Sequence, residues 1–564
     1  MSPVRPSPPP RKGRAGAASR PVPGVPHGLR GPSGGRDAGA DTDPGGEVVT
    51  AHGTTPPDGL GRRCFLTLCA GVGLGTAAAC TAAPPHPHAT TAPGARLRPE
   101  AERDAPGTAD WRLASTGPPQ AVAGYADRVS VAPGERFGLH VSTTAASFRV
   151  SAFRVGWYGG AQARRVWTSE RIPGRARPAP RVLSATRTVR ADWPETLPVD
   201  TSGWAEGAYL LRLEADTGHQ RYVPLIVRST DGTGRTVLMH APATWQAYNR
   251  WGGSSLYNGA SGAYATRSLA VSFDRPYDGE GAGKFQVYEW ALVVLAERLG
   301  IPLAYTTGMD VHRDPGVLRG AHAVVCLGHD EYWTPQQRAH VTAARDAGTN
   351  IAFLGANTCF RRVRLEAGDA ADDRTVVCYK TDYRADPCYG THPALVTTDY
   401  RLPPAPDPES SLTGVLYEGY PVDAPYVVRS AGHWLYEGTG ARSGDAFAHL
   451  VGVEYDRITP GAPTPGELEI IAHSPLVCGG RPSHSDSAYY TAASGAGVFA
   501  TGTMRWVEAL VAGTGMFGRD HGMDARTRAF VTRTTENLLR TFARGPAARH
   551  APPTRANVRE VYGA

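Results

Sequence analysis

The sequence has 564 residues, of which 41% are hydrophobic and 20% are charged, and this is enough for two or three domains with full cores. Its formal net charge of +7 does not indicate a nucleic-acid partner, because the first 63 residues hold eight arginines and one lysine but few acidic residues. Much of the excess basic charge therefore precedes the predicted domains, and we expect no nucleic-acid partner.

The N-terminal part is predicted to direct the protein for export and not to belong to its folded domains. Residues 1–58 are rich in Pro, Gly, Arg and Ala, so we expect a disordered extension. Residues 59–84 indicate a Tat-type export signal, because Arg62 and Arg63 precede a weakly apolar run that is too short to span a membrane. The protein is thus expected to be secreted or attached to the cell envelope. Cys80 ends a stretch similar to a lipoprotein cleavage box, which makes a lipid anchor there an alternative to release.

Five cysteines follow the signal segment, and an odd number in an exported chain leaves at least one outside any internal disulfide. Cys378 and Cys388 lie in one loop-like stretch and are the candidate disulfide. Cys326 lies inside an apolar run and is expected to be a small buried hydrophobe.

After a linker at residues 85–107, residues 108–229 are predicted to form a β-sandwich. Short alternating runs rich in Val, Phe and Tyr are separated by clusters of Gly, Pro and Asp, and no helical period interrupts them. Seven or eight such strands favour an immunoglobulin-like architecture. We expect this domain to have an accessory role.

Residues 236–545 are predicted to form an α/β domain, followed by a tail at 546–564. Apolar strands alternate there with helical periods, as in a parallel, doubly wound sheet. Residues 366–465 interrupt this alternation and are interpreted as an insertion of loops and short strands. The fold class expected for the whole chain is therefore α/β plus all-β.

The clearest candidate site follows the strand at 323–328. His329, Asp330, Glu331 and Tyr332 stand where that strand ends, and ligands of open α/β sheets bind at the carboxyl ends of strands. The alternative is a turn whose polar residues only cap the next helix.

Several familiar catalytic patterns are absent from the sequence, including G-x-S-x-G, the Walker loop, H-E-x-x-H and C-x-x-C. Phenols instead recur beside carboxylates, at Tyr248, at Tyr288 next to Glu289, and at Tyr332 next to Glu331. Phenolate and carboxylate are hard donors that suit a trivalent ion such as Fe(III). The alternative is that these aromatic rings only pack helices against the sheet.

Five short motifs together resemble the large (beta) subunit family of N,N-dimethylformamidase. They are Tyr248–Gly253, Val287–Trp290, Gly328–Trp333, Phe353–Asn357 and Gly497–Thr503. The resemblance implies an amidotransferase-like α/β domain and a mononuclear iron bound by two tyrosines and one glutamate. By motif the tyrosines would be Tyr288 and Tyr332, and the glutamate would be Glu409, with Glu418 in reserve.

The resemblance also implies an amide substrate and a small accessory subunit on a separate chain, and a homo-oligomer is the other assembly considered. His329 or Glu331 would act as the general base, and Asn249 or Asn357 would hydrogen-bond the oxyanion. The chain departs from the family pattern at Asp407, where a histidine is expected two residues before the ligand glutamate. The second hypothesis is therefore an exported, non-catalytic binding protein with the same fold.

Replacing Arg62 and Arg63 with lysine should keep the protein inside the cell, because the Tat machinery reads the arginine pair. Secretion is measured by comparing the protein in cell and medium fractions. Unchanged secretion of the double variant would show that this segment is not a Tat signal.

Overall fold

A computed structural model describes residues 98–368, 373–510 and 521–563. The extension, the signal segment and Cys80 lie outside these residues, and the predictions made for them stay predictions. None of the helices in the described ranges is long and apolar enough to cross a membrane.

The first part of the described chain is a β-sandwich, as predicted. One sheet has the order β1 (Val122–Ala126), β3 (Arg136–Thr143), β9 (Leu197–Asp200). The other has the order β2 (Ser130–Val131), β11 (Gln220–Val227), β10 (Gly207–Ala215), β4 (Ser147–Val155), β5 (Ala163–Thr168), with β6 (Ile172–Pro173) on β4. A shared core between the sheets includes Phe137, Leu139, Val150 and Leu211.

The second part is built on a seven-stranded sheet. Its order is β14 (Leu303–Thr307), β12 (Thr236–His240), β15 (Ala323–Cys326), β17 (Asn350–Phe353), β25 (Gly497–Ala500), β24 (Arg481–Thr491), β23 (Leu468–Cys478). The first five strands are parallel, and the last two extend the sheet in antiparallel fashion. The predicted parallel arrangement therefore holds for the strands before the insertion and for β25.

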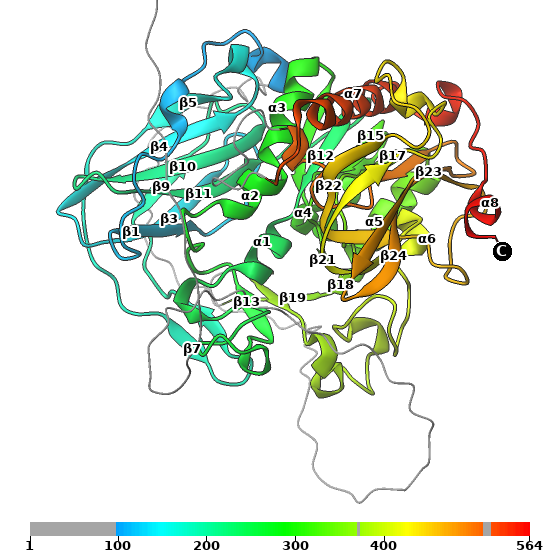
Figure 1. Cartoon of the computed structure of the whole chain (residues 1–564). Coiled ribbons are helices and arrows are strands. Elements are labelled where there is room, and N and C mark those ends of the chain that lie inside the picture. The colour runs from blue at the N-terminus through cyan, green and yellow to red at the C-terminus, as the bar shows by residue number, and fades with distance from the viewer. Residues whose placement is uncertain (1–97, 369–372, 511–520, 564) are drawn as a thin grey trace, which may run out of the picture. The chain divides into compact units, whose positions relative to one another are not determined.

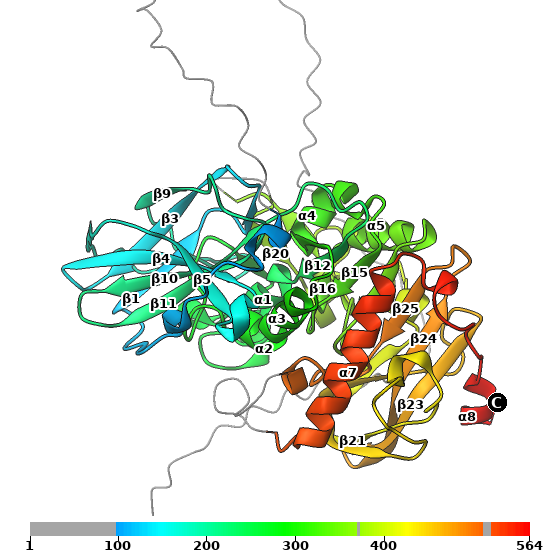
Figure 2. The same cartoon turned by 90° about the horizontal axis from the view of Figure 1, so that it is seen from above.

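Helices cover both faces of this sheet, as expected for a doubly wound domain. One hydrophobic core joins the sheet to α3 (Trp290–Leu299) and α7 (Ala525–Phe542). A second core joins the opposite face to α4 (Gly308–Arg313) and α5 (Pro335–Asp346), which lie side by side (Figure 2). The amidotransferase-like and immunoglobulin-like assignments are finer than this architecture and stay predictions.

Local sequence explains several helix boundaries. The Thr307 and Asp310 side chains form a capping box at the start of α4, and Thr334 accepts a hydrogen bond from the Gln337 backbone at the start of α5. The helical segment before β14 is divided into α2 (Gly283–Tyr288) and α3, with the break at Glu289.

The remaining elements are short except in the insertion. They are β7 (Arg181–Leu183), β8 (Thr188–Arg190), α1 (Pro242–Tyr248), β13 (Ala270–Ser272), β16 (Tyr332–Trp333), β18 (Arg361–Arg362), β19 (Arg364–Glu366), β20 (Thr375–Val377), α6 (Ser410–Thr413), β21 (Leu416–Val427), β22 (Ala446–Arg457) and α8 (Val558–Tyr562). Because β21 and β22 form a long antiparallel pair, the insertion is more ordered than predicted (Figure 1).

The cysteine predictions have different outcomes. Cys326 is fully buried in the core between the sheet and α5, as predicted. Cys378 carries a free thiol, so the predicted disulfide with Cys388 is wrong. Burial raises the pKa of the Cys378 thiol to about 11, which keeps it protonated and unreactive at neutral pH.

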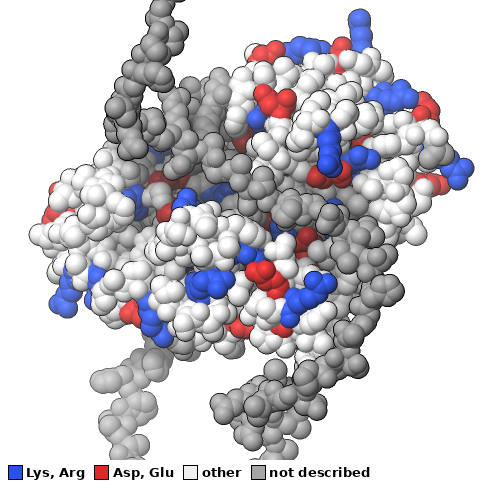
Figure 3. Space-filling view, turned by 60° about the horizontal axis from the view of Figure 1, so that its bottom comes forward, with Lys and Arg blue, Asp and Glu red and all other residues white. Residues whose placement is uncertain are grey.

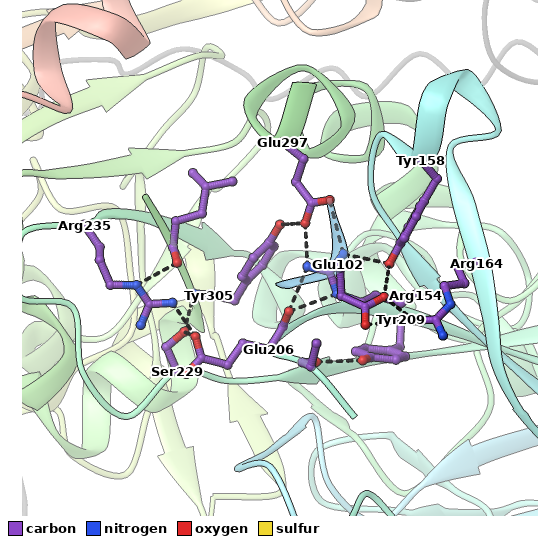
Figure 4. Close-up of polar contacts among 12 residues, drawn as sticks. Glu102, Arg154, Tyr158, Arg164, Glu206, Tyr209, Ser229, Arg235, Glu297 and Tyr305 are labelled. Atoms are coloured by element: carbon purple, nitrogen blue, oxygen red, sulfur yellow. Dashed lines mark hydrogen bonds and ion pairs between the residues drawn. The ribbon is translucent and has the colours of Figure 1, made fainter. Parts of the chain in front are cut away.

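A buried polar network fastens the sandwich to the α/β domain (Figure 4). Arg154 of β4 is buried and pairs with Glu297 of α3, which also accepts a hydrogen bond of 2.7 Å from the Tyr305 hydroxyl. The same guanidinium donates to the backbone carbonyl of Glu206 at 3.0 Å, and the Glu206 carboxylate pairs with Arg235 beside β12. The two domains are therefore joined by fully paired buried charges.

Acidic and basic side chains are interspersed over the face shown in Figure 3. The described residues on this face do not present a field of one sign, which is the feature that attracts nucleic acid.

Replacing Arg154 with methionine should lower the free energy of unfolding by about 3 to 5 kcal/mol, because it leaves Glu297 buried without its charge partner. Urea denaturation measures the change. Arg136→Met is the control, since Arg136 and its partner Asp200 are 76% and 43% exposed, and we expect less than about 1 kcal/mol there. Equal losses for the two variants would contradict a structural role for the buried pair.

Candidate active site

The loop between β15 and β16 carries the candidate residues at the carboxyl end of a central strand. His329, Asp330 and Glu331 are all buried there. Gly328 lets this loop pass close to α2, because an added Cβ would lie 2.4 Å from the Tyr288 carbonyl oxygen. The predicted position of the site at a strand end is thus what the fold shows.

Glu331 is the centre of a group of phenols. The Tyr248 hydroxyl oxygen lies 2.7 Å from Glu331 Oε2, and the Tyr257 hydroxyl oxygen lies 2.8 Å from both carboxylate oxygens. The two hydroxyl oxygens are 2.9 Å apart, and that of Tyr332 lies 2.8 Å from that of Tyr257. We call Tyr248, Tyr257, Glu331 and Tyr332 the phenol–carboxylate cluster.

The sheet brings this cluster together. Tyr248 ends α1, which follows β12, and β12 pairs with β15 in parallel. Tyr257 lies in the loop after α1, while Glu331 and Tyr332 follow β15. Because parallel neighbours end at the same edge, segments about 80 residues apart meet there.

Three cations surround the cluster. Arg361 Nε donates to Glu331 at 3.2 Å, and the Lys380 ammonium lies 3.1 Å from the centre of the Tyr257 ring. The Lys284 ammonium lies 4.0 Å from the centre of the Tyr248 ring. Burial alone would raise the pKa of Glu331, but the charges of Arg361 and Lys380 and the hydrogen bond from Tyr248 bring it below its ordinary value.

The other groups of the cluster are neutral in the absence of a bound cation. Burial and the Glu331 charge raise the pKa values of Tyr248, Tyr257 and Tyr332 well above the ordinary value, so the phenols keep their protons. Burial and the charge of Arg361 lower the pKa of the Lys380 ammonium to about 7. Lys380 therefore titrates near neutral pH.

His329 is held beside the cluster as a neutral imidazole. Its Nε2 atom lies 3.0 Å from the Tyr248 hydroxyl oxygen, and its ring contacts that of Tyr288 with the centres 5.5 Å apart. Burial lowers the pKa of His329 to about 4. At neutral pH the ring has a nitrogen lone pair that can accept a proton.

A second carboxyl group approaches from the insertion. Glu454 of β22 accepts a hydrogen bond of 2.8 Å from the Asn357 amide, in the loop after β17. Burial and the charge of Glu331 raise the pKa of Glu454 to about 8. Two neighbouring carboxyl groups with pKa values moved in opposite directions are typical of an acid and base pair in catalysis.

A cavity of about 470 Å³ lies next to these residues. Tyr248, Lys284 and Tyr288 line it on the side of the cluster, and Val453 lines it beside Glu454. A small molecule in the cavity would therefore lie against Tyr248 of the cluster.

The three residues predicted to bind iron, Tyr288, Tyr332 and Glu409, contact different side chains. Tyr332 is in the cluster, Tyr288 faces His329 and Lys284, and Glu409 pairs with Arg401 and accepts a hydrogen bond from the Tyr417 backbone. The structure thus gives the three predicted iron ligands three different sets of partners. The predicted ligand set of Tyr288, Tyr332 and Glu409 stays a prediction beside the group formed by Tyr248, Tyr257, Tyr332 and Glu331.

Of the two predicted asparagines, Asn357 is near the reacting groups and Asn249 has a structural role. The Asn249 amide nitrogen donates to Gln246 and to the Pro276 carbonyl, and its oxygen accepts from the backbone of Trp251 and Asp278. Its donors are therefore already used. The Asn357 side-chain oxygen is buried and makes no hydrogen bond to the described residues.

The donor chemistry of the cluster fits a hard metal ion. Within the described ranges no group of three His, Cys, Asp or Glu side chains is arranged to hold a metal, so a site would need the phenols. The oxygens of Tyr248, Tyr257 and Glu331 are separated by 2.7 to 2.9 Å. Two oxygens at right angles on a metal, with bonds of about 2 Å, are separated by about 2.8 Å. The triangle therefore has the spacing of one face of an octahedral site.

Sequence reasoning missed three residues of this site, Tyr257, Lys380 and Glu454. Tyr257 and Lys380 stand in loop-like stretches, and Glu454 lies in the insertion, so none follows a predicted strand of the sheet. Tyr248 did have a signal, because it begins the first of the five motifs.

Comparison with known proteins gives one informative match. A family model described as "N,N-dimethylformamidase beta subunit-like, C-terminal" matches residues 149–520, which include every residue of the site. No curated protein matches the sequence. Among solved structures, a Paenibacillus sp. cycloisomaltooligosaccharide glucanotransferase bound to cycloisomaltoheptaose is 13% identical with a TM-score of 0.13. That match covers 21% of this chain and 15% of the other.

Glu454→Gln should have a higher free energy of unfolding than wild type, and this difference should grow as the pH rises from about 4.5 to about 8. In that range native Glu454 keeps its proton while the unfolded chain releases it, so wild-type stability falls as the pH rises. Urea denaturation at about pH 5 and about pH 9, with a chelator present, measures the difference. A difference that does not change with pH would show that native Glu454 is already ionised.

Proposed function

The chain belongs to the N,N-dimethylformamidase beta subunit-like family, and from that premise we propose that it hydrolyses an amide C–N bond beside the phenol–carboxylate cluster. We further propose that Tyr248, Tyr257 and Glu331 hold one Fe(III) ion. The observation that supports this most strongly is the triangle of their oxygens, with separations of 2.7 to 2.9 Å.

The charges of these residues also suit a trivalent ion. A phenol has an ordinary pKa near 10 and is ionised at neutral pH only beside a strong cation. Two phenolates and the Glu331 carboxylate would balance three positive charges, which avoids a net buried charge. Arg361, the nearest permanent cation, is also paired with Asp399.

This ligand set also removes one departure from the family pattern. With Glu331 as the carboxylate, the histidine expected two residues before it is His329. The departure at Asp407 arose from placing the ligand at Glu409. Asp407 pairs instead with Arg338 of α5.

The residues around the cluster supply the proton transfers that amide hydrolysis requires. Neutral His329 can take a proton from the attacking water at a ring nitrogen, and protonated Glu454 can give its proton to the leaving nitrogen. The Asn357 amide, which donates to Glu454, holds that carboxyl group in place. When bound, Fe(III) supplies a Lewis acid that polarises the amide carbonyl and lowers the pKa of water.

The buried ionisable side chains around the cluster favour an enzyme over a non-catalytic binding protein. Glu331, His329 and Lys380 are buried together, and each has its pKa moved away from the ordinary value. Such groups gather at catalytic sites, where their pKa values are matched to proton transfer.

Assembly and location complete the proposal. The family is described as beta subunit-like, which supports a partner subunit on a separate chain. We propose that the protein leaves the cell through the Tat pathway, which carries folded chains, and therefore after the metal is bound. Attachment through a lipid at Cys80 remains the alternative to secretion.

The protein as purified should contain about one iron per chain and show a visible absorption band from the phenolate ligands. Glu331→Gln should lower the iron content at least about tenfold, because it removes the charged ligand. Metal analysis and the visible spectrum measure both properties.

Glu409→Gln is the matched control. Glu409 is also a buried carboxylate beside an arginine, Arg401, but it lies outside the cluster. Iron content and colour should be unchanged in this variant. Loss of iron in Glu409→Gln with retention in Glu331→Gln would place the metal in the set that the sequence motifs predict.

A further inference from the structure

The lining of the cavity beside the cluster includes a group of aromatic rings. Trp245, Tyr277 and Phe285 line it, and we call these three residues the aromatic wall. The ring of Trp245 meets those of Tyr277 and Phe285 edge to face, with centres 6.4 and 6.0 Å apart. The three rings therefore form one continuous surface.

The wall is held rigidly. Trp245 is buried, and its indole nitrogen donates a hydrogen bond of 2.7 Å to Glu289 at the break between α2 and α3. Glu289 also pairs with His240 at the end of β12. Because Glu289 joins a central strand to two helices, the wall has a fixed position relative to the cluster.

The volume of the cavity has room for a ligand larger than N,N-dimethylformamide. N,N-dimethylformamide has only a few non-hydrogen atoms, whereas cavities of roughly 300 to 1,000 Å³ bind drug-sized ligands. A cavity of about 470 Å³ belongs to that class.

Several charged groups that line the cavity have partners in the protein. Glu508 pairs with His521 at 2.7 Å, Arg505 pairs with Asp423 at 2.6 Å, and Asp278 accepts a hydrogen bond from the Arg250 backbone. The remaining lining includes the five rings of Trp245, Tyr248, Tyr277, Phe285 and Tyr288. Contact with rings is therefore one means by which this cavity can select a ligand.

We propose that the substrate is an amide that carries an aromatic ring, with the ring against the aromatic wall and the amide at the phenol–carboxylate cluster. This inference rests on the proposed amide hydrolysis and specifies its substrate class. Remote binding of the ring would hold the amide in position beside His329 and Glu454.

The test compares hydrolysis of N-benzylformamide and N,N-dimethylformamide by the iron-containing protein. We expect kcat/KM for N-benzylformamide to be at least about tenfold higher. Tyr277→Ala should reduce that preference about tenfold, mainly through KM, because it removes one ring of the wall. Tyr277→Phe keeps the ring and should keep the preference, and Tyr389→Ala is the control for an exposed aromatic residue outside the cavity.

Calorimetric titration with N-benzylformamide separates failure of this inference from failure of the proposed function. Hydrolysis of both amides without a preference for the ring would overturn the inference and leave amide hydrolysis standing. Saturable binding that depends on Tyr277, without hydrolysis of either amide, would support the ring site and contradict the proposed reaction. No binding of N-benzylformamide would overturn the inference.

Discussion

The buried charge of Glu331 is the constraint on which the site depends. A carboxylate in the interior needs hydrogen bonds and an opposite charge, and here phenols and Arg361 provide them. Glu331 follows β15, and its partners come from the segment after β12 and from β18, so the parallel sheet has to align its strand ends before the charge can be buried. The arrangement of the sheet is therefore what allows the Glu331 carboxylate to be buried with its partners.

The sandwich contributes to the same site from a distance. Arg154 of the sandwich holds Glu297 on α3, and α3 begins directly after Glu289, which anchors the aromatic wall. Pro224 of β11 also lines the cavity. The domain expected to be an accessory is therefore part of the frame that fixes one side of the cavity.

The sequence was informative where a residue's role follows from its position in a strand and turn. The run before His329 predicted a central strand, and its end predicted the location of the site. Glu331 and Tyr332 were therefore recognised in advance. Glu454 and Lys380 could not be, because each reaches the site from a segment whose path depends on tertiary packing.

The choice of metal ligands shows the same limit. Glu331 is followed by Tyr332 in the sequence, whereas Glu409 lies between Pro408 and Ser410, and neither setting by itself identifies a metal ligand. In the fold Glu409 is paired with Arg401, whereas Glu331 lies within 2.8 Å of two phenol oxygens. Only the three-dimensional contacts separate a buried ion pair from a set of donors that can share a metal.

The central claim is that one metal ion is shared by Tyr248, Tyr257 and Glu331. The most direct measurement is an anomalous difference map, recorded at the iron absorption edge from crystals of the iron-loaded protein. We predict a single peak in contact with the oxygens of these three residues. A peak against Glu409 or Tyr288 instead, or no peak at the cluster after iron loading, would contradict the account.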